Sequence, residues 1–234
     1  MLASILRTIQ NTLSSVINKS RGLVTTTYSF QLKNIDSPWS TCFSSSISNL
    51  LSAIGIEVAP DVITRTVNST EYLAWAQKNI WKWERFLGKM QVVWDVQKKF
   101  VEDILKEKGL DQKYSVVYKS STSRAYIVDQ LRRNFPVVIN TSPWYINPQG
   151  LRFQLGHITT VVGFEEEAKL IDARDNQEKS GLWYIVDDPF GNMLNEYREN
   201  QDKPTAGDDV VIWGNWFDTA VRGGLSISFA EKEQ

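Results

Sequence analysis

The sequence predicts an α+β fold in which a helical part comes first and an antiparallel β-sheet follows. Apolar residues recur at helical spacing in the first half of the chain, and from about residue 114 they give way to short β-branched or aromatic runs bounded by turn residues. With 234 residues, 42% hydrophobic and 23% charged, the chain can form one well-filled domain. No internal repeat, low-complexity stretch or clear linker divides it. Because helices and strands are segregated along the chain, we expect separate layers.

The N-terminal segment, residues 1–22, is predicted to form an amphipathic helix. Its apolar residues recur at helical spacing from Leu2 to Ile17, and every charged side chain before Asp36 is basic. This pattern suits a pro-segment, a targeting segment, or a helix that docks on the domain, a partner or a membrane surface. Arg7 interrupts any signal-type apolar core, and no run of eighteen apolar residues occurs. We therefore expect a soluble protein, of unspecified compartment, with neither a standard signal peptide nor a transmembrane segment.

Residues 23–234 are predicted to form the single domain, which begins with a Thr-rich strand at residues 23–30. A helix follows from Cys42 and stops at Gly55, a residue type that suits a helix C-terminus. Further helices are predicted over residues 69–87, 92–108 and 123–134. The first two of these make residues 61–113 a Trp-rich helical insertion.

The second half of the chain carries the predicted sheet. Its strands are expected at residues 114–118, 137–141, 158–164, 182–186, 210–213 and 225–229. The region from residue 192 to residue 216 is predicted to be loop and edge structure.

The chain has one Cys, one His and a net charge of −1. A single Cys excludes an internal disulfide and argues against a Cys-based zinc site, and the acid spacing does not match a calcium loop, so we expect no metal and no cofactor. The near-zero charge gives no reason to expect nucleic-acid binding. By default a lone Cys is a small buried hydrophobe, and a lone His is a structural residue. A functional role for either has to come from its sequence context.

Cys42 stands at the start of a predicted helix, directly after a loop in which Ser40 or Thr41 can cap that helix. The macrodipole and free N–H groups of a helix N-terminus favour the thiolate, which is the form that nucleophilic catalysis requires. The same N–H groups can bind a developing oxyanion. Cys42 is therefore a candidate nucleophile, provided that a base lies near it.

His157 is the one histidine that could be this base, and it opens the predicted strand 158–164. It can take the thiol proton and later protonate the leaving group. The strand that ends at Val186 leads into Asp187 and Asp188, and a carboxylate there can accept the imidazole N–H and fix its tautomer. The alternatives are a hydrogen-bonded structural His and an Asp-rich solvated turn.

Together these motifs resemble cysteine peptidase family 39, the double-glycine leader peptidases, and its broader relatives. The similar segments are Gln31 with Ser-Pro-Trp-Ser-Thr-Cys42, Gly156-His157 with the strand after it, and Val186-Asp187-Asp188-Pro189-Phe190-Gly191-Asn192. The resemblance covers about residues 28–60 and 135–200, and leaves the helical insertion unmatched.

The resemblance implies a papain-like cysteine peptidase fold, with the Cys helix packed on the antiparallel sheet. It further implies Cys42 as nucleophile, His157 as base, Asp188 as the residue that orients the base, and Gln31 as oxyanion donor. Asn34 is an alternative donor. Strand alternation separates Asp188 from its neighbour Asp187, because successive side chains point to opposite faces.

The leading hypothesis is a cysteine peptidase or amide hydrolase that acts through an acyl-enzyme thioester. The expected substrate is a peptide or the peptide part of peptidoglycan. Trp39, near the nucleophile, and Trp144, on the loop before His157, are predicted to line the cleft, since peptide and sugar chains stack on such rings. Two alternatives stay open: a non-catalytic binding or assembly protein on the same scaffold, and a transglutaminase-like acyl transferase.

Overall fold

The structure is a computed structural model that describes residues 21–35, 41–79, 89–147, 149–154, 156–197 and 205–232. The predicted N-terminal helix from Leu2 to Ile17 and the predicted cleft residue Trp39 lie outside these ranges.

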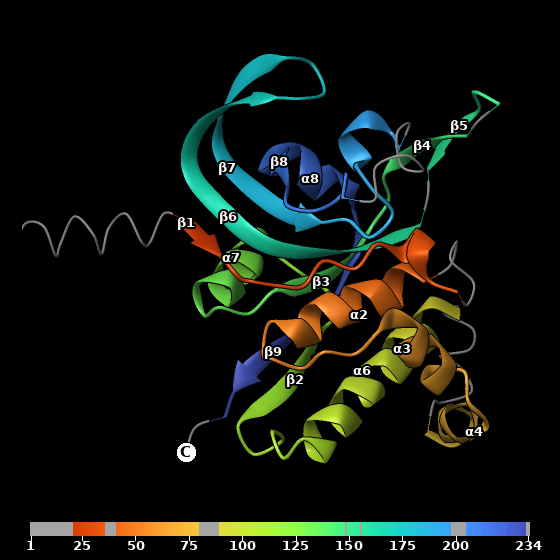
Figure 1. Cartoon of the computed structure of the whole chain (residues 1–234). Helices are drawn as coiled ribbons and strands as arrows, with labels where there is room; N and C mark the ends of the chain where they lie inside the picture. Colours follow the sequence, from red (N-terminus) through yellow and green to blue (C-terminus); the bar gives the residue numbers. More distant parts are fainter. Residues whose placement is uncertain are drawn as a thin grey trace, which may run out of the picture.

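One seven-stranded sheet forms the centre of the molecule, and all of its strand pairs are antiparallel (Figure 1). Its strands are β1 (Arg21–Leu23), β2 (Tyr114–Lys119), β3 (Val137–Thr141), β6 (His157–Asp172), β7 (Gln177–Asp187), β8 (Val210–Trp213) and β9 (Val221–Glu231). Their order is β2-β9-β3-β6-β7-β8, with β1 also paired to β6. A separate two-stranded sheet joins β4 (Trp144–Ile146) to β5 (Arg152–Gln154).

Helices cover both faces of this sheet. One face carries α2 (Cys42–Ser52), α3 (Pro60–Val67), α4 (Thr70–Asn79) and α6 (Lys89–Glu107), and the other carries α7 (Arg124–Arg132) and α8 (Gly214–Ala220). Figure 1 shows the β6–β7 hairpin curling over α8. Two short 3-10 helices, η1 (Gln31–Lys33) and η3 (Met193–Asn195), lie in the loops. The predicted α+β class is confirmed.

Strand β3 shows how the sheet divides the core. It is buried along its whole length, and its side chains alternate between the two hydrophobic clusters. Val138 packs with α2, α3 and α6, whereas Val137 and Ile139 pack with α7 and α8. A strand covered on both faces reads as a continuous apolar run, which is what its sequence shows.

The predicted strand at residues 23–30 is wrong beyond Leu23, because the edge of β6 is already occupied. β1 pairs Leu23 with Gly163 on β6, and β3 pairs Val137 with Val161 on the same strand. An antiparallel continuation of β1 would therefore meet β3. After a last backbone hydrogen bond from Val24 N to Val162 O (2.7 Å), residues 25–30 have no regular secondary structure.

Several elements differ from the sequence prediction. The strands β6 and β7 extend further than expected and make one long hairpin. The helix α3 was not predicted, although Pro60 in its first turn is a start signal. The region from residue 192 to residue 216 contains the predicted strand at residues 210–213 as β8, but also the short helix η3 and the start of α8, which were not predicted. The helix predicted over residues 69–87 is described only as α4, since residues 80–88 are outside the described ranges.

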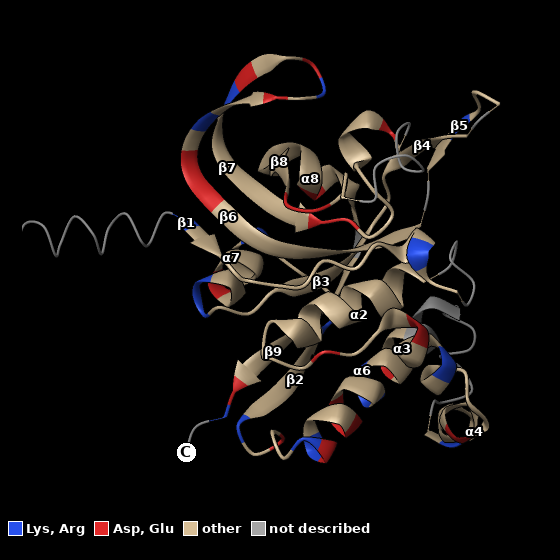
Figure 2. Cartoon of the chain, in the orientation of Figure 1, with Lys and Arg blue, Asp and Glu red and all other residues tan. Residues whose placement is uncertain are grey.

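Charges of both signs are interspersed over the helices and the β6–β7 hairpin (Figure 2). No helix among the described residues combines the length and apolar character needed to cross a bilayer.

Candidate active site

Cys42 is the first residue of α2, and its side chain is half-buried. One turn further along, α2 is bonded to β6: Ser46 Oγ donates to Ile158 O (3.2 Å), and Thr160 Oγ1 donates to Ser46 O (3.3 Å). These bonds hold the helix across the strand whose first residue is His157. They therefore bring the start of the helix to the start of the strand.

The N-terminus of α2 is held by Asn34 rather than by a helix cap. Thr41 is the N-cap residue, but its side chain makes no capping hydrogen bond, so the predicted cap by Thr41 is wrong. The buried Asn34 Nδ2 donates to Thr41 Oγ1 (2.7 Å) and to Ser45 Oγ (3.1 Å). An amide nitrogen has two hydrogens, so these bonds use both. The alternative assignment of Asn34 as oxyanion donor would require breaking one of them.

His157 lies between Cys42 and Asp188. Its Nε2 is 2.6 Å from Asp188 Oδ1, and the Cys42 side chain lies near enough to its ring to raise its pKa. Since Asp188 engages Nε2, the ring nitrogen left for the thiol is Nδ1. The pair is almost sealed from solvent, with 2% of His157 and none of Asp188 exposed.

Asp188, just past the end of β7, accepts hydrogen bonds on both carboxylate oxygens. Besides His157, Oδ1 accepts from Phe190 N (3.0 Å), and Oδ2 accepts from the Tyr197 hydroxyl (2.9 Å). Its backbone N–H donates to Gly207 O (2.8 Å). A carboxylate bonded in this way is fixed in one orientation and can hold the imidazole in a single tautomer.

The electrostatics favour a charged imidazole. Burial by itself lowers the pKa of His157, but the Asp188 carboxylate, its hydrogen bond and the Cys42 side chain outweigh burial and raise the pKa to about 10. Burial, followed by the charge of Asp188, raises the pKa of Tyr197 well above its ordinary value. Tyr197 therefore stays protonated and keeps donating to Asp188.

Asp187 points away from the histidine. Its Oδ2 accepts from Thr26 Oγ1 (2.7 Å) and lies 3.5 Å from Asn49 Nδ2, and its Oδ1 accepts from Asp209 N (3.3 Å). Burial raises the pKa of Asp187 to about 7. Two adjacent carboxyl groups on opposite sides of one strand end thus have different partners.

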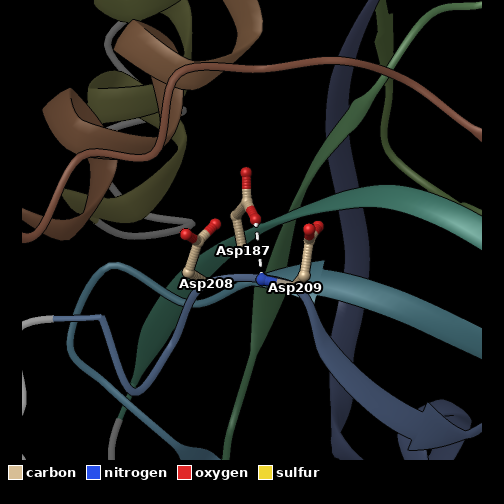
Figure 3. Close-up of side chains that lie close together, drawn as sticks. All are labelled: Asp187, Asp208 and Asp209. Atoms are coloured by element: carbon tan, nitrogen blue, oxygen red, sulfur yellow. Dashed lines mark hydrogen bonds between the residues drawn. The ribbon is translucent and has the colours of Figure 1, made fainter.

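Figure 3 shows Asp187 beside Asp208 and Asp209. One carboxylate oxygen of each lies within 4.8 Å of the others. Among the described residues, these three are the acidic, Cys or His side chains that lie close enough together to bind one metal ion. Oxygen donors of this kind suit Mg²⁺ or Ca²⁺. A proton on the buried Asp187 would reduce the negative charge of the cluster as a bound cation would. The raised pKa of Asp187 indicates that the proton does so.

The other predicted site residues lie at different places. Gln31, in η1, is buried, and its backbone N–H donates to Pro189 O (2.8 Å), which sets it against the Asp188 turn. Trp144 is 38% exposed on β4 and lines a pocket of about 490 Å³, but neither Cys42 nor His157 lines that pocket.

Sequence reasoning did not find Tyr197. It lies in a segment predicted as loop, and no spacing pattern links it to Asp188 before the chain is folded. In the structure its ring and that of Phe190 pack against the His157 ring, at centroid distances of 5.9 and 6.1 Å.

Comparison with known proteins agrees with this arrangement of helix and sheet. The model of the Peptidase C39 like family matches residues 24–218 and includes the helical segment that the sequence resemblance left unmatched. A search of curated proteins finds no match. The family description supports a papain-like fold and a cysteine-peptidase type of function, as the motifs around Cys42 and His157 predicted. The chain belongs to the Peptidase C39 like family.

Proposed function

We propose that this protein is a cysteine peptidase or amide hydrolase with Cys42 as nucleophile, His157 as general base and Asp188 as the orienting residue. The observations that carry the proposal are the 2.6 Å contact between His157 Nε2 and Asp188 Oδ1, and the position of Cys42 at the start of α2, where its side chain helps to raise the pKa of His157. The order of these groups is the one that nucleophilic catalysis by a thiol requires.

The proposed reaction begins from the pair in which the Cys42 proton is already on His157 Nδ1, which leaves a thiolate beside a charged imidazole. The sulfur attacks the carbonyl carbon, and the C=O electron pair moves to the oxygen. When this intermediate collapses, the C–N bond breaks and His157 gives its proton to the departing amine, which leaves a thioester. A water molecule then attacks the thioester, His157 takes the water proton, and the acid product leaves as the thiol is restored.

Gln31 is proposed to stabilise the oxyanion together with the backbone N–H groups at the start of α2. Its place in η1, next to the Asp188–Pro189 turn, supports this role. The competing donor Asn34 is already bonded to Thr41 and Ser45. Preorganised donors stabilise the negative charge that develops on the carbonyl oxygen.

Alkylation of Cys42 by iodoacetamide at pH 6 tests the proposal, because the chain has one Cys and the signal has one source. Free cysteine is almost entirely a thiol at pH 6, so a thiolate paired with His157 should alkylate up to roughly 100-fold faster. His157→Ala should remove this acceleration, and urea-unfolded protein is the control. A native rate equal to that of free cysteine would contradict the proposal.

Product analysis separates hydrolysis from its alternatives. Peptides and peptidoglycan fragments are incubated with the protein with and without an added primary amine. Hydrolysis gives a carboxylic acid, whereas an acyl transferase gives the amide of the added amine. The burial of His157 is the observation that favours a non-catalytic binding protein, since a base with 2% exposure needs substrate to enter past Cys42. Fast alkylation without product from any substrate would support that alternative.

A further inference from the structure

A second site lies beyond the aromatic residues that pack on His157. It is the pocket of about 490 Å³ whose walls come from the β4–β5 sheet, the tip of the β6–β7 hairpin, η3 with Glu196, and α8. Its volume falls in the range of small-molecule sites, about 300–1,000 Å³. Figure 1 shows these elements on the α8 side of the sheet, opposite α3 and α6.

Two tryptophans, each covered by an arginine, line this pocket. The guanidinium carbon of Arg152 lies 4.3 Å from the Trp144 ring centre, and that of Arg174 lies 4.5 Å from the Trp216 ring centre. Stacking on the guanidinium holds each indole in one orientation. Trp144, 38% exposed, therefore offers the more open ordered aromatic surface, because Trp216 also packs against the hydrophobic cluster under α7 and α8.

The charges around the tryptophans are already neutralised in pairs. Arg152 donates from Nε (2.9 Å) and from a terminal nitrogen (2.7 Å) to Glu196 Oε1. Arg174 Nε donates to Asp172 Oδ1 (2.9 Å), and a terminal guanidinium nitrogen of Arg174 donates to Asp172 Oδ2. An anionic ligand would have to compete with these carboxylates. A neutral ligand with many hydroxyl groups can instead bond to the remaining N–H groups and to the carboxylate oxygens.

From this combination we propose that the pocket binds a neutral sugar unit. The C–H face of a pyranose ring is apolar and suits an indole surface, while its hydroxyls suit the arginine and glutamate groups at the edge. Taken with the proposed amide hydrolysis, on which this extension rests, the substrate is a glycan-linked peptide.

One segment joins the pocket to the triad. Glu196 and the next residue, Tyr197, both have a left-handed backbone, with φ of 58° and 62°. This conformation is uncommon for residues other than glycine and costs about 1–3 kcal/mol each. It lets Glu196 face the pocket partner Arg152 while the Tyr197 hydroxyl donates to Asp188. The pocket wall and the support of the triad are thus adjacent residues.

Calorimetry tests sugar binding without any turnover when the Cys42→Ser protein is used. The probes are the trimer of N-acetylglucosamine, maltotriose and sodium sulfate. We expect at least one trisaccharide to bind, and Trp144→Ala to weaken that binding 10-fold or more. Trp144 is partly exposed, so this variant should fold even if Trp216→Ala does not.

Trp213→Ala is the matched control. Trp213 also lies under a cation, with Lys179 Nζ 5.5 Å from its ring centre, but it does not line the pocket. It should leave sugar binding unchanged. The proposal is overturned if neither trisaccharide binds, if Trp213→Ala weakens binding as much as Trp144→Ala, or if only sulfate binds.

A kinetic comparison separates this proposal from the proposed function. The substrates for the Cys42 protein are a peptidoglycan fragment with its disaccharide and the same peptide without sugar. We expect a KM at least 10-fold lower for the sugar-bearing form, and Trp144→Ala should raise it to the value of the bare peptide with kcat unchanged. Equal KM values with normal hydrolysis overturn the sugar site alone. Sugar binding without hydrolysis of either substrate overturns the hydrolase alone.

Discussion

Asp188 makes more hydrogen bonds within the site than its position in the sequence suggests. Its Oδ1 accepts from Phe190 N and lies against His157 Nε2, and its Oδ2 accepts from Tyr197. Since the carboxylate is fully buried, each of these bonds works at low dielectric, where an unpaired charge would be costly. The state of the His157 ring is therefore set mainly by Asp188.

A titration of the single histidine measures that dependence directly. Asp188→Asn removes the charge that raises the pKa of His157 and leaves burial, which lowers it. NMR of the one His should show a pKa near 10 in the native protein and a value several units lower in Asp188→Asn. The Cys42→Ser variant is the control, because it keeps the carboxylate. Equal shifts in the two variants would contradict a dominant role of Asp188.

The same pKa predicts how His157 contributes to stability. Its pKa is raised on folding, so its contribution is complete below about pH 6.5 and is lost as the pH rises through about 10.

Asp187 should make the protein less stable as the pH rises in a lower range. Its folded-state pKa of about 7 lies above that of an unfolded Asp, so the folded protein holds a proton that the unfolded chain loses from about pH 4. The free energy of unfolding of the native protein should therefore fall by roughly 4 kcal/mol between pH 4 and pH 8 because of this group. In Asp187→Asn that part of the fall should be absent.

Urea unfolding at several pH values gives the difference between the two proteins, in which the contribution of His157 cancels. Asp209→Asn is the matched control from the same cluster, since Asp209 is exposed and its substitution leaves the buried carboxyl in place. Parallel pH curves for the native protein and Asp187→Asn would show that Asp187 is ionised in the fold.

For single residues, the sequence predicted the features that depend only on neighbouring residues in the chain. Cys42 and His157 are the only residues of their types, and strand alternation at the end of β7 distinguishes Asp188 from Asp187. Tyr197 and the pairing of Arg174 with Trp216 could not be predicted. They depend on how the long hairpin and a loop close on each other, which no local periodicity records.

Among the elements, α2 shows where periodicity is informative and where it is not. Its apolar residues predicted the helix correctly, yet the serines between them are buried too. Ser46 is bonded to β6, Ser48 Oγ donates to Val58 O, and Asn49 lies beside Asp187. A Ser-rich stretch ordinarily indicates a loop or an exposed face. Here the hydroxyls satisfy backbone and side-chain groups around a helix that is enclosed by the rest of the domain.

The N-terminus of α2 gives a prediction that separates structure from catalysis. Asn34→Ala removes both bonds that hold this turn and should lower the free energy of unfolding by about 1–3 kcal/mol. Gln31→Met keeps the side-chain bulk but removes the proposed oxyanion donor, so hydrolysis should fall by about 10²–10³. Alkylation by iodoacetamide forms no oxyanion and should keep its native rate in Gln31→Met.

Urea unfolding, alkylation rates and hydrolysis rates of both variants are compared with the native protein. The reverse pattern, with turnover lost selectively in Asn34→Ala and retained in Gln31→Met, would transfer the oxyanion role to Asn34.

For the whole molecule, the decisive feature is that two hydrophobic clusters share one sheet. In the ladder between β3 and β9, Val138 pairs with Ile227, and both side chains belong to the cluster under α2, α3 and α6. The next residue, Ile139, belongs to the cluster under α7 and α8. If β3 unfolds, it therefore removes side chains from both clusters at once. The α+β class and the strand positions were predictable from periodicity, but this coupling follows from the strand order, which the sequence does not reveal.

We therefore expect the clusters to unfold in a single transition, although they lie on opposite faces of the sheet. Ile227→Ala and Ile139→Ala each remove a fully buried side chain from a different cluster, and each should lower the free energy of unfolding by about 2–5 kcal/mol. Hydrogen exchange read by mass spectrometry should show α6 and α8 losing protection together in both variants. Ile171→Ala, at a site 57% exposed on β6, should change neither helix. Loss of protection confined to α6 in Ile227→Ala, with α8 unchanged, would mean that the sheet does not couple its two faces.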